Sequence, residues 1–334
     1  MPTLVVQAAT ANTIDPGDEG AQTASLSDVS VSDAMPVVTS TSEWTSEAFS
    51  KQVPPKDWCD AGLLVPHEAL RHEMLLMEKS AGLLVAADDP AQDGWRSVNF
   101  SNWYTGIFHP LIHAHHDNEE LIYFPWVATK ASLPEKLTAD HKTLVVLLDS
   151  IKAHCEAVAT ANGGPGAAEA IASIRKEVPL FVAEMIAHLK EEEEIIPPLM
   201  RAHFTQAEEN AVVGQIIQVR LLPTSSIMTH VITSLPVFSV VVFAASPRQK
   251  GGLTEARFFL PSIKLTMAKW ASPEMRAGVD GGIPPPLVHL LNNYFVPDYQ
   301  NVYGMMRDSP GLEAKPALKK VPCCMIPCCF PCLC

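Results

Sequence analysis

The chain has 334 residues, of which 47% are hydrophobic, and a formal net charge of −13 at pH 7. That length is sufficient for one or two domains with an apolar core. The acidic excess disfavours nucleic acid and anionic membrane surfaces as general partners, because both repel a negatively charged protein. The chain does not open with basic residues followed by an apolar run, so we expect neither a secretory signal nor an organellar transit peptide.

The cysteines are unevenly placed. Of the eight, Cys59 and Cys155 are isolated, and the other six fall within the last twelve residues. A disulfide framework would spread along the chain. We therefore predict an intracellular, cytoplasmic protein whose main part is reduced.

Residues 1–55 are rich in Ser, Thr, Ala and Asp and have little periodicity, which predicts a disordered leader. From residue 56 to residue 204 the pattern changes to four successive stretches of helical periodicity. These run from about 60 to 86, from 98 to 123, from 133 to 162 and from 167 to 200. Pro110 predicts a kink or a late start in the second stretch.

Each of the four stretches carries one histidine on its apolar stripe: His67, His115, His141 and His188. Two of these histidines have a glutamate four residues later, in the pairs His115 with Glu119 and His188 with Glu192. Residues four apart lie on nearly the same face of a helix. Because a buried unpaired charge is costly, such pairs on apolar stripes need a partner, and a metal ion is the simplest one.

The neighbouring pair His116 and Glu120 lies on a different face, together with His109 and His113. That face is polar throughout, so we expect it to face solvent. A single histidine on an apolar stripe is most simply a hydrogen-bonded core residue. Four in register with four helices instead predict a metal site built from facing side chains. Mixed imidazole and carboxylate donors suit iron, manganese or zinc and do not suit calcium or magnesium.

This arrangement resembles the hemerythrin-like, or HHE cation-binding, family over about residues 60–203. The signature is one histidine on the first and third helices and His-x-x-x-Glu on the second and fourth. The resemblance implies an all-α fold, namely an antiparallel four-helix bundle that holds two non-haem iron ions, with manganese or zinc as alternatives. The implied ligands are His67, His115, Glu119, His141, His188 and Glu192.

The sequence departs from the oxygen-carrying members of that family at one position. Those proteins have a second histidine four residues after the first on the third helix, where this chain has Val145. One imidazole is therefore absent from the expected set. The position is open or is filled by water, Glu193 or His116, which disfavours classical reversible oxygen transport.

Three functional hypotheses follow from the resemblance. The first is a non-enzymatic di-iron protein that binds dioxygen or senses iron or redox state. The second is a di-iron oxidase or peroxide-reducing enzyme, favoured by a histidine-poor site with an open position. The third is a structural or adaptor protein with a vestigial metal site.

Residues 205–220 form a predicted accessory helix with Thr205 as its N-cap. The segment 221–250 is apolar, and residues 221–246 contain no Asp, Glu, Lys or Arg. It is long enough to span a membrane, but it is also consistent with a buried or irregular insertion or with an artefact of gene prediction. Residues 251–310 predict an α-helical, Pro-rich extension, with Ser272 as an N-cap.

Residues 311–334 form a cysteine-rich tail in which two lysines precede cysteines set among apolar residues. That composition favours S-acylation and attachment to a membrane. Soft-metal binding by thiolates and the absence of any function are the alternatives. The candidate acylation sites are Cys323, Cys324, Cys328, Cys329, Cys332 and Cys334.

Overall fold

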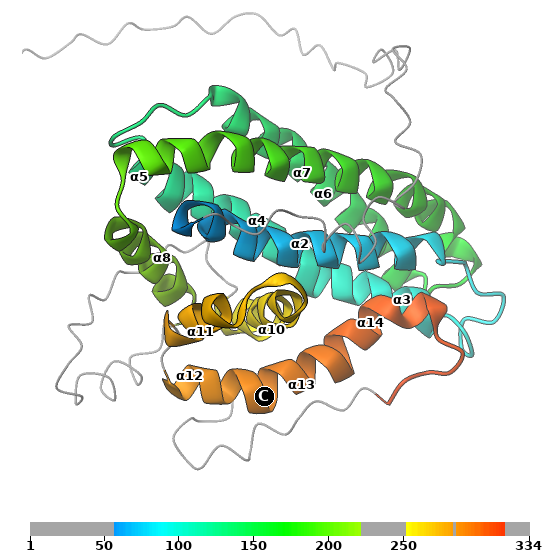
Figure 1. Ribbon diagram of the computed structural model, residues 1–334. Coiled ribbons are helices and arrows are strands. Elements are labelled where there is room, and N and C mark those ends of the chain that lie inside the picture. The colour runs from blue at the N-terminus through cyan, green and yellow to red at the C-terminus, as the bar shows by residue number, and fades with distance from the viewer. Residues whose placement is uncertain (1–56, 222–251, 283–284, 318–334) are drawn as a thin grey trace, which may run out of the picture. The chain divides into compact units, whose positions relative to one another are not determined.

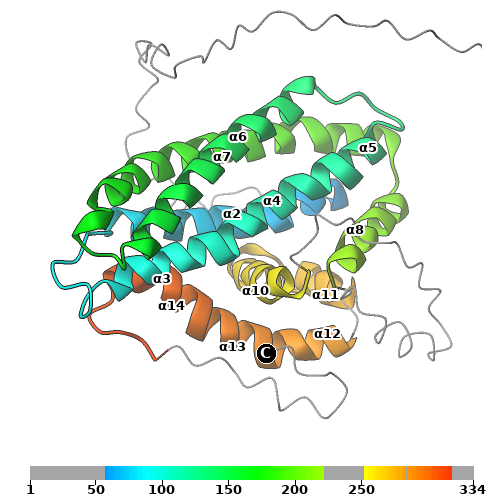
Figure 2. The same ribbon diagram turned by 180° about the vertical axis from the view of Figure 1, so that it is seen from behind.

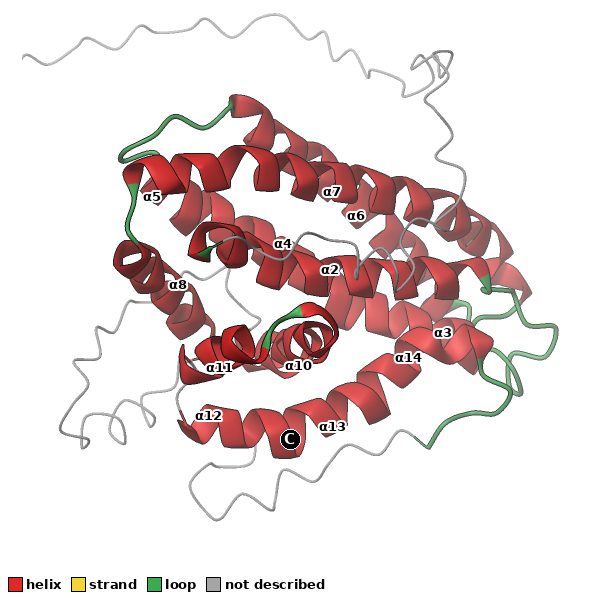
Figure 3. Cartoon of the chain, in the orientation of Figure 1, coloured by secondary structure: helices red, strands yellow, loops and turns green. Residues whose placement is uncertain are grey.

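The computed structural model describes residues 57–221, 252–282 and 285–317, all within one unit of the chain, residues 40–334. Throughout these residues the regular secondary structure is helical, without any strand (Figure 3). The prediction of an all-α protein is therefore confirmed for the described residues. The predicted leader, nearly all of the apolar segment 221–250 and the six tail cysteines lie outside them.

Four long helical stretches carry the predicted site residues (Figure 1). The first is α2 (Trp58–Gly82). The second is built from three short helices, α3 (Trp95–Trp103), α4 (His109–Asn118) and α5 (Phe124–Val127). The third is α6 (Glu135–Thr160) and the fourth is α7 (Ala168–His203). Helix α7 contacts both α2 and α6, and α3 contacts α6 (Figure 2).

The apolar stripes of these helices meet in a common core, which explains why the periodicity of the sequence was informative. Its fully buried members come from all four stretches and include Leu70, Met74, Phe108, Ile112, Leu148, Val178 and Phe181. Burial of each such side chain stabilises the fold by about 1.5–3 kcal/mol.

The second stretch continues through its prolines and widens locally just before each of them. Two π-helical turns, Tyr104–Phe108 and Glu119–Tyr123, join α3 to α4 and α4 to α5. The second residue after each turn is a proline, Pro110 and then Pro125. Proline has no N–H to donate to the carbonyl four residues earlier, so the regular α-helical hydrogen bond is missing at each of these positions. Pro110 nevertheless neither ends the helix nor delays its start.

Side chains fix the ends of two helices. Asp57 caps α2 by accepting a hydrogen bond from the Cys59 N–H at 3.0 Å. Arg201 near the end of α7 donates to both Asp57 oxygens, at 2.7 and 2.9 Å. Helix α8 (Gln206–Leu221) begins with a capping box, in which the Glu208 carboxylate accepts from the Thr205 N–H at 2.9 Å. The predicted N-cap role of Thr205 is confirmed, because its Oγ1 accepts a hydrogen bond from the Glu208 N–H at 3.4 Å.

The C-terminal extension is helical, as predicted. Its α-helices are α10 (Gly252–Trp270), α11 (Pro273–Gly282), α12 (Pro285–Leu290), α13 (Val296–Asp298) and α14 (Gly304–Asp308). Ser272 accepts from the Met275 N–H at 3.2 Å and so caps α11. Among the helices that the structure describes, none is both long and apolar enough to cross a membrane.

The extension is attached to α2 through a buried carboxylate. Glu73 accepts hydrogen bonds from Ser262 Oγ at 2.9 Å and from the Tyr299 hydroxyl. It also pairs with Arg307, whose Nη1 lies 2.7 Å from Glu73 Oε2. Three segments of the extension therefore converge on one residue of the helix that carries His67.

Candidate metal centre

All six predicted site residues lie together in the protein interior. Helix α2 contributes His67, α4 contributes His115, and Glu119 begins the π-turn that follows α4. Helix α6 contributes His141, and α7 contributes His188 and Glu192. Every one of them is buried.

The first group within this cluster consists of His67, His115, Glu119 and Glu192. One ligand atom from each lies within 4.8 Å of the others. The Nε2 atom of His115 is 3.3 Å from Glu119 Oε1, and the Nε2 atom of His67 is 3.5 Å from Glu192 Oε2. Helices α2, α4 and α7 thus bring two imidazoles and two carboxylates to one point.

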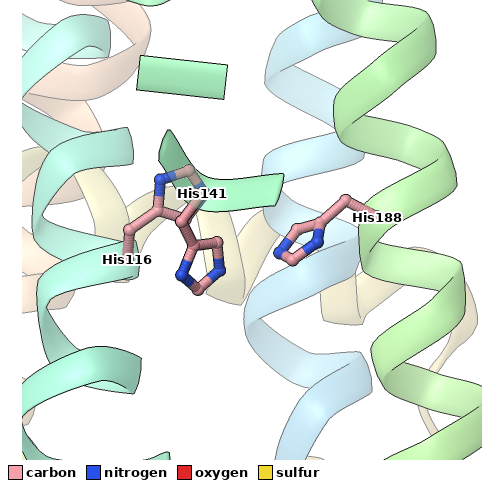
Figure 4. A group of neighbouring side chains, drawn as sticks. All are labelled: His116, His141 and His188. Carbon is pink, nitrogen blue, oxygen red and sulfur yellow. The ribbon is translucent and has the colours of Figure 1, made fainter. Parts of the chain in front are cut away.

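The second group consists of His116, His141 and His188, whose ligand atoms also lie within 4.8 Å of one another (Figure 4). His116 was expected to face solvent, and that expectation is wrong, because only 4% of the residue is exposed. Its ring stacks on that of His141, and the ring of His188 meets both edge-on.

The error has a simple geometric cause. Adjacent helix residues point about 100° apart, so His115 and His116 both lie inside a buried sector of that width. Leu111 and Ile112, one turn earlier, are likewise both buried, and Asp117 is exposed. The apolar pair Leu111 and Ile112 was the signal in the sequence that both histidines face the core.

The two glutamates connect the two groups. Glu119 places Oε1 near His115 and Oε2 3.5 Å from His141 Nε2. Glu192 places Oε2 near His67 and Oε1 3.3 Å from His188 Nε2. Each carboxylate therefore presents one oxygen to each group, which is the arrangement that lets a carboxylate bridge two cations.

Outer residues orient two of the imidazoles. His67 Nδ1 lies 2.8 Å from Glu193 Oε1, and Arg71 Nη1 lies 2.8 Å from the same oxygen. His141 Nδ1 lies 2.7 Å from Glu120 Oε1, so Glu120 does not merely face solvent. Hydrogen bonds to Nδ1 leave Nε2 free to point inward, which is how proteins commonly orient metal-binding histidines. Glu193 is engaged with His67 and Arg71 and does not take the place of the absent imidazole.

The inward-facing atoms of the cluster lack hydrogen-bond partners among the described residues. This holds for at least one atom of each of the seven side chains: His67, His115, His116, His141, His188, Glu119 and Glu192. Leaving a buried polar atom unsatisfied costs about 1–3 kcal/mol, and native structures contain few of them. Metal cations satisfy such atoms directly, so the donor set fits a metal site.

The protonation of two of the histidines, His115 and His116, also fits metal binding. Burial lowers the pKa values of His115 and His116 well below the ordinary value, which keeps both rings neutral and their lone pairs available. Burial, together with the charge of Glu192, raises the pKa of Glu119 to about 7. Burial lowers the pKa of His67, but interactions with Glu119 and Glu193 outweigh it and raise that pKa to about 9.

An open depression of about 910 Å³ lies next to two residues that contact His141. Its lining includes Glu120 and Phe124. Glu120 hydrogen-bonds His141, and the ring of Phe124 stacks on His141 with planes 9° apart.

Comparison of the chain with protein-family models, with curated proteins and with solved structures found no match. The class of site is therefore defined by its residues alone. It consists of two neighbouring buried groups, one of histidines and glutamates and one of three histidines, each of which could hold a metal ion.

Proposed function

We propose that this chain is a hemerythrin-like protein that holds two non-haem iron ions and binds dioxygen or senses iron or redox state. In this proposal α2, the α3–α5 stretch, α6 and α7 form an antiparallel four-helix bundle around the metal centre. The observation that carries the proposal is the set of seven buried side chains whose inward-facing atoms have no hydrogen-bond partner among the described residues.

The donor set divides naturally between two ions. His67 and His115 would hold one ion, and His116, His141 and His188 would hold the other. Glu119 and Glu192 would bridge them, since each presents one oxygen to each group. His116 therefore supplies the imidazole that the third helix lacks, and it was one of the candidates that the sequence left open.

Iron is the metal we favour, with manganese or zinc as alternatives, because the donors are imidazoles and carboxylates only. Two iron ions in such a site supply reversible reaction with dioxygen and one-electron redox change. The protein's own contribution is to bury the site, to orient His67 and His141 through Glu193 and Glu120, and to keep His115 and His116 neutral.

The enzymatic alternative rested on a histidine-poor site. With His116 in the donor set, five imidazoles face two carboxylates, and that basis is removed. We therefore propose a binding or sensing role rather than catalysis. The adaptor alternative requires that the site hold no metal, and the elemental analysis described next tests that requirement.

The test is elemental analysis of the purified full-length chain, together with its optical spectrum with and without oxygen. We expect about two iron ions per chain and a spectrum that changes with oxygen. Chelation should also lower the melting temperature, since a ligand at 100 times its Kd stabilises the folded state by about 2.7 kcal/mol. The double substitution His115→Ala and His188→Ala should abolish this sensitivity. Metal-free protein whose melting curve does not respond to iron would contradict the proposal.

A further inference from the structure

A second histidine cluster lies on another side of α4, apart from the buried centre. His109 and His113 are one helical turn apart, with ring centroids separated by 4.5 Å. Asp149 of α6 faces both, with Oδ1 2.6 Å from His109 Nε2 and 3.4 Å from His113 Nε2. The three ligand atoms lie within 4.8 Å of one another. Unlike the buried centre, this cluster reaches solvent, because the Asp149 side chain is 55% exposed.

One of the two printed separations from Asp149 falls in the range of donors that share one metal ion. Zinc binds nitrogen and oxygen donors at about 2.0–2.2 Å, so two donors at angles between 90° and 109° lie about 2.9–3.5 Å apart. The contact of Asp149 with His113 falls in this range, and its contact with His109 is slightly shorter. An ion at this position would replace the hydrogen bond between Asp149 and His109, and the Asp149 side chain is exposed to solvent.

The chemistry of the donors selects a kind of ion. Two imidazoles and one carboxylate suit divalent first-row transition metals and do not suit calcium or magnesium. Burial lowers the pKa of His109, which leaves its ring neutral at neutral pH and able to bind a cation. Three protein donors at a half-exposed position leave the remaining coordination positions to water, so the ion would exchange readily.

We propose that His109, His113 and Asp149 form a solvent-accessible, exchangeable site for a divalent first-row transition-metal cation. This site is separate from the buried centre and does not depend on the function proposed for it.

The experiment titrates the full-length chain with Co²⁺, after its thiols have been blocked with N-ethylmaleimide to remove cysteine ligation. Equilibrium dialysis and the visible absorption of bound Co²⁺ report binding. We expect the wild-type chain to bind one rapidly exchanging equivalent of Co²⁺. In the double variant His109→Gln with His113→Gln, the affinity for this equivalent should be at least tenfold weaker. The single variant Asp149→Asn, which changes one exposed carboxylate, should also weaken the binding of Co²⁺ at this site.

The matched control is His154→Gln. His154 on α6 also faces a single carboxylate, Glu177 at 3.3 Å, but among the described residues it belongs to no group of metal-ligand side chains, so its loss should leave Co²⁺ binding unchanged. The variant with His115→Ala and His188→Ala should retain the exchangeable equivalent, which separates this site from the buried centre. Equal Co²⁺ binding by the wild type, the double variant and Asp149→Asn would overturn the proposal, as would the absence of an exchangeable equivalent in the wild type.

Discussion

The imidazole rings of His116 and His141 stack with their centroids 4.2 Å apart and their planes inclined by 22°. The two residues belong to α4 and α6 and are brought together only by the contact between these helices. His116 has both ring nitrogens buried without a hydrogen-bond partner among the described residues. Native structures contain few buried polar atoms of this kind, so the role of His116 in metal binding is the first to test.

Replacing His116 with alanine should lower the iron content of the full-length chain from about two ions to about one. The reason is that His116 is one of only three imidazoles available to the second ion in our proposal. Elemental analysis after removal of loosely bound metal is the measurement. His203→Ala at the exposed end of α7 serves as the control and should keep the wild-type content. An unchanged content in His116→Ala would exclude His116 as a ligand.

Glu193→Gln should weaken metal binding by about 10–100-fold, because the carboxylate that orients His67 would lose its charge. The matched control is Glu194→Gln on the same helix. Glu194 is exposed and lies 3.8 Å from Lys190, away from the cluster. Competition with a chelator of known affinity measures both variants. Equal affinities in the two variants would show that Glu193 does not support the site.

Arg307→Met should destabilise the fold by about 3–5 kcal/mol, because it would leave Glu73 buried without its charged partner. The double variant with Glu73→Gln should recover part of that loss, since the buried charge is then removed as well. Urea denaturation followed by circular dichroism measures the free energy of unfolding. A loss below about 1 kcal/mol for Arg307→Met would mean that the pair contributes little to anchoring the extension.

Glu209 should make stability depend on pH. Glu209 is buried. A Cβ atom built at Gly62 would lie 2.1 Å from Glu209 Oε1, so the contact between α2 and α8 leaves the Glu209 carboxylate little space. Burial, with the charge of Asp57, raises the pKa of Glu209 from 4.5 to about 7. The pKa of Glu209 is higher in the folded protein than in the unfolded chain, so protonation of Glu209 favours folding. This contribution to the free energy of unfolding is complete below about pH 4.5 and is lost as the pH rises through 7.

The expected result is that Glu209→Gln matches the wild type near pH 4.5 and is more stable at pH 8, by up to about 3 kcal/mol. Urea denaturation of both proteins at the two pH values gives the comparison. If Glu209→Gln and the wild type differ in stability by the same amount at both pH values, Glu209 ionises normally in the folded protein.

The cysteine-rich tail lies outside the described residues, and its acylation remains a prediction. Each buried methylene contributes about 0.8 kcal/mol, so two acyl chains should hold the protein on membranes while one leaves binding reversible. Expression in a eukaryotic cell, labelling with a palmitate analogue and fractionation before and after hydroxylamine provide the measurement. A truncation ending at Lys320 should be soluble and unlabelled. Full-length protein that is itself soluble and unlabelled would exclude the anchor.

The sequence by itself determined the all-α class and the main candidate site residues. Helical periodicity exposed four stripes, and the i, i+4 spacing placed His115 with Glu119 and His188 with Glu192, because backbone geometry alone sets which residues share a face. The same local rules located the caps at Thr205 and Ser272. They needed no knowledge of neighbouring helices, since a capping side chain bonds the first turn of its own helix.

Tertiary structure decided what lies between helices. The adjacent residues His115 and His116 are both buried, although only the preceding pair Leu111 and Ile112 indicated this locally; how wide a sector of α4 is covered depends on the packing of its neighbours. The orientation of His67 by Glu193 and of His141 by Glu120 is likewise set across helices. Arg307 reaches Glu73 across 234 residues of chain, a contact that no local pattern encodes. Pairings of this kind arise from the geometry of the packed core, which the periodicity of a single stretch does not contain.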